Sequence, residues 1–515
     1  MRITFAYLET FWTEHLDKDR YEHVRLGTDL PIGLGTVRAF AELDAAVRRK
    51  TEMVNRTFQD GTPEEEVLAE LRKTAPEMVA FSLYLWNAPR TYRICERLKD
   101  DRPCPRIVVG GPEVPRGEEK LRAFMEEHPY IDAAVCGEGE EAFAGLLKAA
   151  VKGAAAGAEA VPGLGLRKGK DIVVTPPRAE PVDLAKVPSP YLNGSIAILP
   201  SETRMVCVET SRGCPFSCAY CDYHAGRRKM RHFPIQRLER ELELLHKGGF
   251  RGCVYIADPF LNLEKERVLK VFRVLQRWPN RFHMELKAEL FDDELVSALG
   301  KVPLSSVAVG IQSTHAPTLK NIQRAFDLEA ATGNIRKLLA HPNVLLDLEF
   351  ILGLPGDNYE TFRRSMDWAL SFSPLPQLTL FDLVLLPNSP LASMKERFSL
   401  QVDPEGLVHG SSSFSPDDMM RASWLFAAYC WLRNTSGFKE KLEQLLHKPG
   451  VRPSAVLEKV GLRLVETGFL PKERIIGQGG RRPDTRGQGE GGKRPKRWIE
   501  LSKLGTGGVE AEAWW

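Results

Sequence analysis

The sequence predicts an α/β protein in which a doubly wound, Rossmann-like domain precedes a partial (βα)6 barrel and a C-terminal helical extension. Apolar strand patterns alternate with helical patterns through the first 155 residues, and six further units of this kind follow from residue 205 to residue 387. Continuous apolar strands separated by helices indicate parallel sheets covered on both faces. We therefore expect domains at 1–155, 201–395 and 396–475, a linker at 156–200 and a disordered tail at 476–515, which is rich in glycine and charge.

The composition is that of a soluble globular chain of two or three domains. Of its 515 residues, 43% are hydrophobic and 27% are charged, with a net charge of +3. This near balance gives no reason to expect nucleic acid or a membrane as a partner. The apolar start of the chain is interrupted at Glu9, and no window approaches the ~18 uncharged apolar residues of a membrane span. We expect a cytoplasmic location, where cysteines act as ligands or buried thiols.

The first domain contains candidate strands at 2–8, 78–87 and 105–114, a helix at 31–43, and a strand, turn and helix at 130–150. A doubly wound sheet binds its ligand at the carboxyl ends of its strands, which here carry SLYLWN, GGPEV and GEGEE. Residues 154–192 contain a glycine-rich and a proline-rich stretch, which predict a hairpin and a linker.

The second domain contains six candidate strands, at 205–209, 252–258, 282–288, 306–313, 343–353 and 377–387. Helical patterns such as 234–248 and 359–372 separate them. In barrels of parallel strands the active site is built from loops at the carboxyl ends of the strands. The loop SRGCPFSCAYC directly follows the first strand, so we expect the chemistry there.

That loop carries Cys214, Cys218 and Cys221. A structural zinc site needs a fourth ligand, for which His224 is the nearby candidate. An iron–sulfur cube held by three thiolates instead leaves one iron free to bind a small molecule. The remaining cysteines lack ligand spacing and are predicted to be inert core thiols: Cys95, Cys104, Cys136, Cys207, Cys253 and Cys430.

The Cys-x3-Cys-x2-Cys spacing after a strand, with Tyr220 beside the last cysteine, resembles the signature of the radical S-adenosylmethionine superfamily. The resemblance implies a [4Fe–4S] cluster on the three cysteines, with S-adenosylmethionine bound to the fourth iron and cleaved to a 5′-deoxyadenosyl radical. A Gly-Gly-Glu run that often grips the cofactor reads Ala257-Asp258-Pro259 here. The positions implied to contact S-adenosylmethionine are Tyr220, Asp258, Glu285, Lys287, Gln312, Ser313 and Gly353.

The N-terminal sheet followed by this barrel resembles the cobalamin-dependent radical S-adenosylmethionine enzymes over residues 1–395. The Asp-x-His-x-x-Gly sequence that supplies a lower axial histidine in many cobalamin proteins is absent from residues 1–155, and His15 and His23 are expected at the surface. A sheet that has lost the cofactor is the alternative. The positions implied to contact cobalamin are Ser82, Tyr84, Gly110, Gly111, Glu113, Gly137, Glu138 and Gly139.

The resemblance implies a methyltransferase that acts on an unactivated carbon of a small molecule or natural product. One S-adenosylmethionine would methylate cobalamin, and a second would yield the radical that activates the substrate, with electrons from a flavodoxin- or ferredoxin-type reductant. A non-methylating rearrangement or cyclisation, an RNA- or peptide-modifying reaction such as methylthiolation, and a catalytically silent cobalamin or cluster sensor are the alternatives. Methylthiotransferases carry three further cluster cysteines in their first domain, whereas Cys95, Cys104 and Cys136 fall on separate predicted elements.

Overall fold

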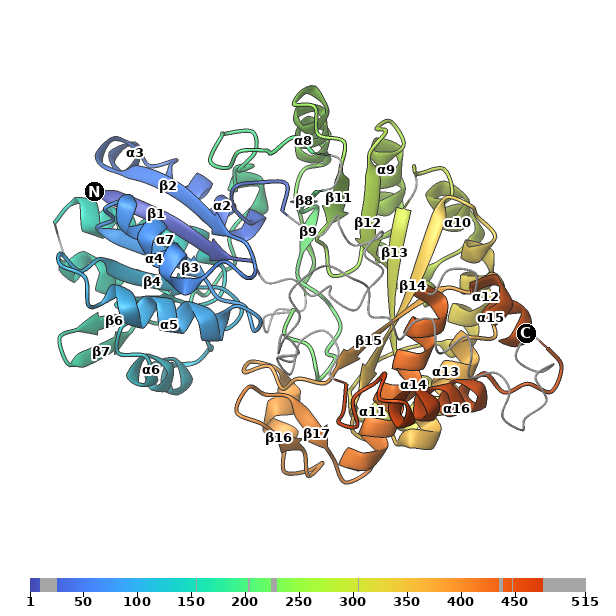
Figure 1. Ribbon diagram of the computed structural model, residues 1–515. Helices are drawn as coiled ribbons and strands as arrows, with labels where there is room; N and C mark the ends of the chain where they lie inside the picture. Colours follow the sequence, from blue (N-terminus) through green and yellow to red (C-terminus); the bar gives the residue numbers. More distant parts are fainter. Residues whose placement is uncertain are drawn as a thin grey trace.

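The computed structural model contains two large, mainly parallel sheets that lie side by side, with a helical C-terminal region packed beside the second one (Figure 1). It describes residues 1–9, 26–153, 155–201, 204–223, 229–303, 305–434, 439–446 and 448–475. His15, His23, His224 and the tail at 476–515 lie outside the described residues, so the predictions made for them stay predictions.

The first sheet has seven strands in the order β2-β1-β3-β4-β5-β6-β7. The first five are parallel: β1 (Arg2–Leu8), β2 (Glu52–Phe58), β3 (Met78–Ser82), β4 (Arg106–Gly110) and β5 (Ala133–Val135). The antiparallel hairpin β6 (Leu164–Lys168) and β7 (Asp171–Val174) extends the sheet beyond residue 155. This part of the predicted linker therefore belongs to the first sheet. The short 3₁₀ turns η2 (Ala155–Ala160) and η3 (Leu184–Lys186) flank the hairpin.

Helices cover both faces of this sheet, as the continuous apolar strands predicted. In β1, Ile3 and Phe5 pack under α2 (Ile32–Ala41) and α7 (Gly139–Val151), which touch each other and α3 (Ala45–Lys50). Ala6 and Leu8 belong to the core on the other face, under α4 (Glu64–Lys73), α5 (Ala88–Leu98) and α6 (Glu118–Glu127). Because β1 pairs with both β2 and β3, the order of the strands reverses between β1 and β3, which is where doubly wound sheets bind their ligands.

The second sheet has six parallel strands in the order β15-β14-β13-β12-β11-β8, which confirms the partial barrel. Its strands are β8 (Met205–Val208), β11 (Cys253–Ile256), β12 (Arg281–Glu285), β13 (Ser305–Gln312), β14 (Val344–Leu352) and β15 (Gln377–Asp382). Its helices are α8 (Ile235–Lys247), α9 (Lys265–Leu275), α10 (Asp293–Leu299), α11 (Ala316–Asn321), α12 (Leu328–Leu339) and α13 (Tyr359–Ala369), and the 3₁₀ turn η4 (Ala288–Leu290) follows β12.

The strands of the barrel separate an apolar face from a polar one. In β14, Leu348 and Phe350 are almost fully buried in the core that the helices cover. Successive side chains of a strand point to opposite faces, so Asp347 and Glu349 share the other face. The barrel interior is consequently lined by ionisable groups, which are costly to bury without a function or a partner.

The C-terminal region contains the 3₁₀ turn η5 (Pro390–Met394) and the helices α14 (Pro416–Asn434), α15 (Lys439–Leu446) and α16 (Pro453–Glu466). A hairpin of β16 (Gln401–Val402) and β17 (Val408–Gly410), which the sequence did not predict, precedes the helices. Arg474 pairs with Asp382 at the carboxyl end of β15, so the last described residues lie against that end of the strand. None of the helices in the described residues is long and apolar enough to cross a membrane.

Candidate active site

The three cysteines of the predicted cluster site lie in a loop whose two ends are held together. The loop leaves β9 (Ser211–Arg212) and returns at β10 (Arg231–His232), and these two short strands pair in antiparallel fashion. Gly213 opens the loop at a φ of 95°, and a Cβ atom there would lie 2.4 Å from the Lys229 carbonyl oxygen. Only glycine allows this close approach of the two chain ends. We call residues 213–230, of which the structure describes 213–223 and 229–230, the cluster loop, and β9–β10 its neck.

The thiols of Cys214, Cys218 and Cys221 are partly buried and close enough to affect one another. Burial raises the pKa of Cys214, and it raises the pKa of Cys221 to about 12, with the charges of Cys218 and Cys214 adding to the effect. Thiolates in this loop therefore need a bound cation, because metal ligation displaces the proton and compensates the charge.

No group of three or more His, Cys, Asp or Glu side chains in the described part of the chain is arranged around a single metal ion. Each thiolate of a cluster ligates a different iron, so cluster ligands need not converge on one point. The donor set, three thiols on one loop, fits the predicted iron–sulfur cluster better than a structural zinc ion.

Two cations lie beside the cluster loop. The Arg324 guanidinium donates to the Tyr220 hydroxyl at 3.1 Å and lies 3.9 Å from the Cys218 sulfur, and it also donates to the Gly310 carbonyl oxygen. Its Nε atom is buried and has no hydrogen-bond partner. The Lys287 ammonium lies 4.1 Å above the Phe216 ring and 2.6 Å from Glu289, and burial lowers its pKa.

Asp258, predicted to contact S-adenosylmethionine, is saturated by hydrogen bonds within the protein. Its carboxylate accepts from the backbone and hydroxyl groups of Thr210, at 2.7 and 2.5 Å, and of Ser211, at 3.1 and 2.7 Å. Burial nevertheless raises its pKa. Asp258 therefore positions Ser211, the first residue of the neck. Its contact with the cofactor stays a prediction.

Three predicted positions at the ends of β13 and β14, Gln312, Ser313 and Gly353, have different surroundings. Gln312 ends β13 at an irregularity with a φ of 71°, and its Oε1 atom is buried without a partner. Ser313 donates to Asp357 at 3.2 Å, so its hydroxyl is already used. Gly353 has a φ of 99°, and a Cβ atom there would lie 2.7 Å from Met419 of α14. Of the three, Gln312 is the one with an unused polar atom.

Two carboxylates inside the barrel, those of Glu285 and Glu349, are close enough for their charges to interact. Glu285 accepts a hydrogen bond from the Tyr255 hydroxyl at 2.7 Å, and burial raises its pKa to about 7. Burial also raises the pKa of Glu349 well above its usual range, with the charges of Glu285 and Asp347 adding to the effect. Sequence reasoning missed Glu349 and Arg324. A carboxylate inside the apolar run LLDLEFILG was a usable signal for Glu349, whereas nothing local pointed to Arg324.

The positions predicted to contact cobalamin lie at the carboxyl ends of β3, β4 and β5. After β3, the Tyr84 ring stacks on Trp86 with centroids 4.6 Å apart and lies edge-on to Tyr7. Gly110 is the last residue of β4. The next residue, Gly111, has a φ of 106°, and a Cβ atom there would lie only 2.5 Å from the Leu83 carbonyl oxygen.

These loops bring further groups to the same end of the sheet. Ser82 ends β3, and burial raises the pKa of Glu113 in the loop after β4. Gly137 has a φ of 80°, and Gly139 begins α7. The glycine-bearing loops follow β4 and β5, at the same carboxyl edge of the sheet as the switch point between β1 and β3 and on the β3 side of it.

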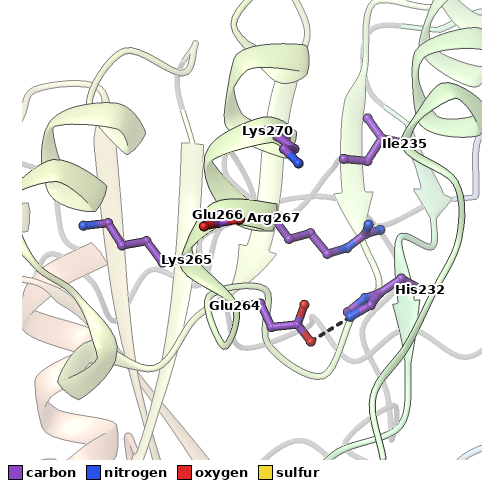
Figure 2. Close-up of a pocket in the computed structure, with 7 residues that line it drawn as sticks. All are labelled: His232, Ile235, Glu264, Lys265, Glu266, Arg267 and Lys270. Carbon is purple, nitrogen blue, oxygen red and sulfur yellow. Dashed lines mark hydrogen bonds and ion pairs between the residues drawn. The ribbon is translucent and has the colours of Figure 1, made fainter.

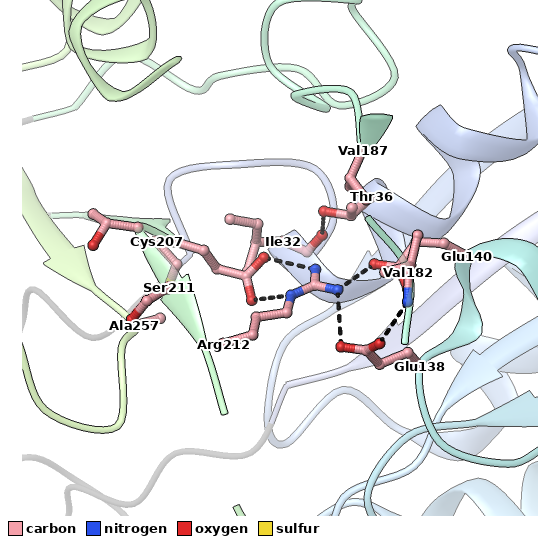
Figure 3. A network of polar contacts seen from close by, with 12 residues as sticks. Ile32, Thr36, Glu138, Glu140, Val182, Val187, Cys207, Ser211, Arg212 and Ala257 are labelled. Carbon is pink, nitrogen blue, oxygen red and sulfur yellow. Dashed lines mark hydrogen bonds and ion pairs between the residues drawn. The ribbon is translucent and has the colours of Figure 1, made fainter. Parts of the chain in front are cut away.

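Glu138 does not point into a free space. Its carboxylate lies 3.9 Å from Arg212, which also pairs with Glu140 at 2.7 Å (Figure 3). The Glu138 carboxylate also pairs with Arg231. The N-terminus of α7 is therefore bound to the neck of the cluster loop. The contact with cobalamin predicted for Glu138 stays a prediction, and its observed partners are the two arginines of the barrel domain and the Val182 backbone N–H.

A cavity of about 430 Å³ lies beside the neck, between β10 and α9 (Figure 2). Its wall includes His232, which shares a hydrogen bond of 2.9 Å with Glu264, and Arg267, which donates to the Thr210 and Phe233 carbonyl oxygens. None of the sequence-predicted site residues lines it. The other residues that line it are Ile235, Lys265, Glu266 and Lys270.

The six cysteines outside the cluster loop lie on separate elements. Cys95 is buried in α5, as expected, but Cys104 is exposed in the loop between α5 and β4, so the prediction of a core thiol was wrong there. The short polar segment around Cys104 has no apolar neighbours that would bury it. Cys95, Cys104 and Cys136 thus do not form a second cysteine loop.

Comparison with known families agrees with this division of the chain. Residues 31–147 match the B12 binding domain, and residues 208–369 match the Radical SAM superfamily. A relative from Streptomyces tokunonensis, the cobalamin-dependent radical SAM methyltransferase TokK, is 29% identical over 76% of this chain and 58% of its own length. The 2-(S-pantetheinyl)-carbapenam-3-carboxylate methyltransferase of Streptantibioticus cattleyicolor is 27% identical over 84% of this chain and 70% of its own length.

Solved structures share the whole arrangement. The cobalamin-dependent S-adenosylmethionine radical enzyme OxsB, with aqua-cobalamin and S-adenosylmethionine bound, superposes with a TM-score of 0.63 at 13% identity, covering 93% of this chain and 76% of that one. The radical S-adenosylmethionine methyltransferase TsrM from Kitasatospora setae, with cobalamin and a [4Fe–4S] cluster, gives a TM-score of 0.59 at 15% identity, covering 91% of this chain and 100% of that one. With a B12-binding domain followed by a radical SAM domain, the chain belongs to the cobalamin-dependent radical SAM enzymes, which use a [4Fe–4S] cluster, S-adenosylmethionine and cobalamin.

Proposed function

We propose that the chain is a methyltransferase that transfers a methyl group to an unactivated carbon of a small molecule. The observation that carries the proposal is the direct contact between the predicted cobalamin loops and the cluster loop. Arg116, in the loop after β4, forms a bidentate ion pair with Asp222, the residue after Cys221, with both N–O distances at 2.7 Å. The two cofactors would therefore face one shared space. The two relatives named as methyltransferases support the same reaction class.

When bound, the cluster with S-adenosylmethionine supplies a hydrogen-abstracting radical, and cobalamin supplies a methyl carrier. We assign the cluster to Cys214, Cys218 and Cys221. Arg324, beside Cys218 and with a buried Nε atom free to donate, suits the carboxylate of S-adenosylmethionine.

Glu285, Glu349 and the unpaired Oε1 atom of Gln312 suit the hydroxyl groups of its ribose. An external one-electron reductant of the flavodoxin or ferredoxin type would supply the electrons.

The chain's own residues also exclude water from this space. Asn388, after β15, accepts a hydrogen bond from the Arg116 backbone at 2.8 Å and donates to the Pro112 and Val114 carbonyl oxygens at 3.3 and 3.4 Å. These bonds hold the loop after β4 against the end of the barrel. Water exclusion protects a radical from side reactions and strengthens the electrostatic interactions that orient the substrate.

The test uses anaerobically reconstituted protein loaded with hydroxocobalamin, a chemical reductant and S-adenosylmethionine carrying a deuterated methyl group. Cobalt and iron are quantified per chain. We expect S-adenosylhomocysteine to form and the extracted cobalamin to carry the deuterated methyl group, which requires no knowledge of the substrate. A carbapenam thioether is the first substrate to add, because one relative's name specifies such a compound. Protein that is loaded with cluster and cobalt but transfers no label to cobalamin would refute methyl transfer.

One alternative has specific support. The anaerobic magnesium-protoporphyrin IX monomethyl ester cyclase of Cereibacter sphaeroides is 26% identical over 60% of this chain. A non-methylating reaction of this kind predicts 5′-deoxyadenosine without S-adenosylhomocysteine in the same assay. A sensor predicts neither product. Methylthiolation is disfavoured by the separate locations of Cys95, Cys104 and Cys136.

A further inference from the structure

The neck of the cluster loop is bound to the B12-binding domain by a partly buried network of charges (Figure 3). Arg212 of β9 donates to Glu140 at 2.7 Å and to Glu209 at 3.1 and 2.8 Å. Arg231 of β10 donates to Glu138 and, at 2.9 Å, to the Val182 carbonyl oxygen. Both strands of the neck therefore present an arginine to the first residues of α7. We call these contacts the neck latch.

The tip of the cluster loop, away from its neck, is bound to a different loop of the B12-binding domain. This second contact is the ion pair between Arg116 and Asp222, and we call it the tip latch. Arg116 lies 106 residues before Asp222 and belongs to the loop that follows β4, whereas the neck latch uses the loop that follows β5. Of the three loops predicted to hold cobalamin, the loop after β4 is thus bound to the tip of the cluster loop and the loop after β5 to its neck.

Burial makes both latches sensitive to the position of the cluster loop. The exposed fractions are 4% for the Glu140 side chain, 14% for Arg212 and 10% for Asp222. Moving the cluster loop away would separate Glu140 and Asp222 from their arginine partners, whereas Arg212 would keep Glu209. Separating a buried charge from its partner is strongly unfavourable. The positions of the loops after β4 and β5 therefore depend in part on the cluster loop, besides the bonds that Asn388 and Val182 make to them.

We propose that the two latches couple the binding of the cluster to the binding of cobalamin, so that each cofactor raises the affinity of the chain for the other. A cluster ligated by three cysteines of one loop fixes that loop, because a ligand site for a metal is ordered by the metal. The fixed loop presents Arg212, Arg231 and Asp222 to the cobalamin loops, which are then ordered before cobalamin arrives. The coupling is reciprocal, as equilibrium linkage requires.

The proposal rests on the binding of both cofactors and not on methyl transfer, so it is tested by affinity. Hydroxocobalamin is titrated by anaerobic equilibrium dialysis into the full chain with and without its cluster, with iron quantified in each sample. We expect the cluster to lower the dissociation constant about tenfold, within the roughly 5- to 150-fold range of coupling between protein sites. In Arg116→Gln, which breaks the tip latch from the cobalamin side, the cluster should change the dissociation constant less than about threefold.

The second variant and the control separate coupling from general damage. Glu140→Gln weakens the neck latch and should also reduce the cluster effect. Asp101→Asn breaks an ion pair of 2.8 Å with Arg72 inside the B12-binding domain, away from the barrel, and should keep the full tenfold effect. The dissociation constant without the cluster should stay within about twofold of the wild-type value in every folded variant.

Three results would overturn the proposal. They are equal cobalamin affinity in the two forms of the wild-type chain, an unchanged cluster effect in both latch variants, and loss of the effect in Asp101→Asn as well. In each of these cases cobalamin still binds, so methyl transfer remains open. Absence of cobalamin binding in both forms would overturn the coupling and the proposed methyltransferase together.

Discussion

Replacement of Arg212 by methionine should release the B12-binding domain from the neck of the cluster loop. Methionine keeps much of the length of the side chain but removes three charge-assisted hydrogen bonds, to Glu140 at 2.7 Å and to Glu209 at 3.1 and 2.8 Å. Bonds of this kind contribute roughly 1.5–3 kcal/mol each and are not additive. Loss of one partner of a buried ion pair costs roughly 3–5 kcal/mol. We therefore expect about 4 kcal/mol of local destabilisation.

Hydrogen exchange measured by mass spectrometry tests this expectation. It reports the free energy of local opening, which suits a chain of several domains that need not unfold in one step. At about 1.4 kcal/mol for each tenfold, a loss of about 4 kcal/mol predicts roughly 700-fold faster exchange at the slowest amides of α7 and of the neck. Peptides from α4, on the opposite face of the first sheet, should be unaffected.

A double-mutant cycle separates the ion pair from other effects of the substitution. Glu140→Gln removes the carboxylate that Arg212→Met leaves unpaired, so the double variant should be about 2 kcal/mol more stable than the sum of the two single effects. A loss below about 1 kcal/mol for Arg212→Met would refute the reasoning. So would additivity of the two single variants to within about 0.5 kcal/mol.

Three further changes have clear expected outcomes. Cys214→Ala should remove the cluster iron and abolish formation of 5′-deoxyadenosine while the circular dichroism spectrum is retained; iron that persists would contradict the ligand assignment. Gly111→Ala should cost about 3 kcal/mol in thermal unfolding, because of its φ of 106° and the Leu83 oxygen 2.5 Å from the new Cβ, whereas Gly61→Ala, with a φ of 81° and open space, should cost about 1 kcal/mol. Burial raises the pKa of Glu285 from 4.5 to about 7, so the folded state binds the extra proton and wild-type stability should fall as the pH rises from about 5 to about 7. Glu285→Gln should show a smaller fall, because the raised pKa of Glu349 still contributes to it, and should gain on the order of 2 kcal/mol relative to wild type at pH 8, measured by urea unfolding at pH 5 and pH 8; an unchanged slope would show that another group is responsible.

Elements with a continuous apolar pattern were predictable, and those held by tertiary contacts were not. All six strands of the barrel agree with the predicted runs to within a few residues, because each carries apolar residues on the face that the helices cover. The strand β2 was missed because it lies at the edge of its sheet and its sequence, EMVNRTF, is largely polar. The two-residue strands of the neck have no pattern of their own and exist because the cluster loop closes there.

The residues of the candidate site also divide into those that the sequence predicted and those that depend on tertiary contacts. The three cysteines and the glycine-bearing loops carry short-range signals, and the structure places them at facing ends of the two sheets (Figure 1). A whole helix, α11, separates Gln312 from Arg324 along the chain, and the Arg324 side chain reaches back to Cys218. The ion pair of Arg116 and Asp222 joins two domains. Such partners are separated by many residues, so periodicity and motif spacing do not reveal them. For the same reason Glu138 was predicted as a ligand contact, and its arginine partners were not foreseen.

The loop after β3 differs from the two latched loops in what holds it, and the difference limits how much the latches can control. The Asn87 side chain accepts from the Tyr84 backbone at 2.8 Å and donates to the Ser82 carbonyl oxygen at 3.0 Å and to the Leu8 carbonyl oxygen at 3.4 Å. All of these partners belong to the first sheet, at its switch point. These hydrogen bonds tie the loop that carries Tyr84 and Trp86 to its own sheet. Cobalamin should retain a basal affinity that depends on this loop when both latches are broken, and the cluster should control only the additional affinity that the loops after β4 and β5 provide.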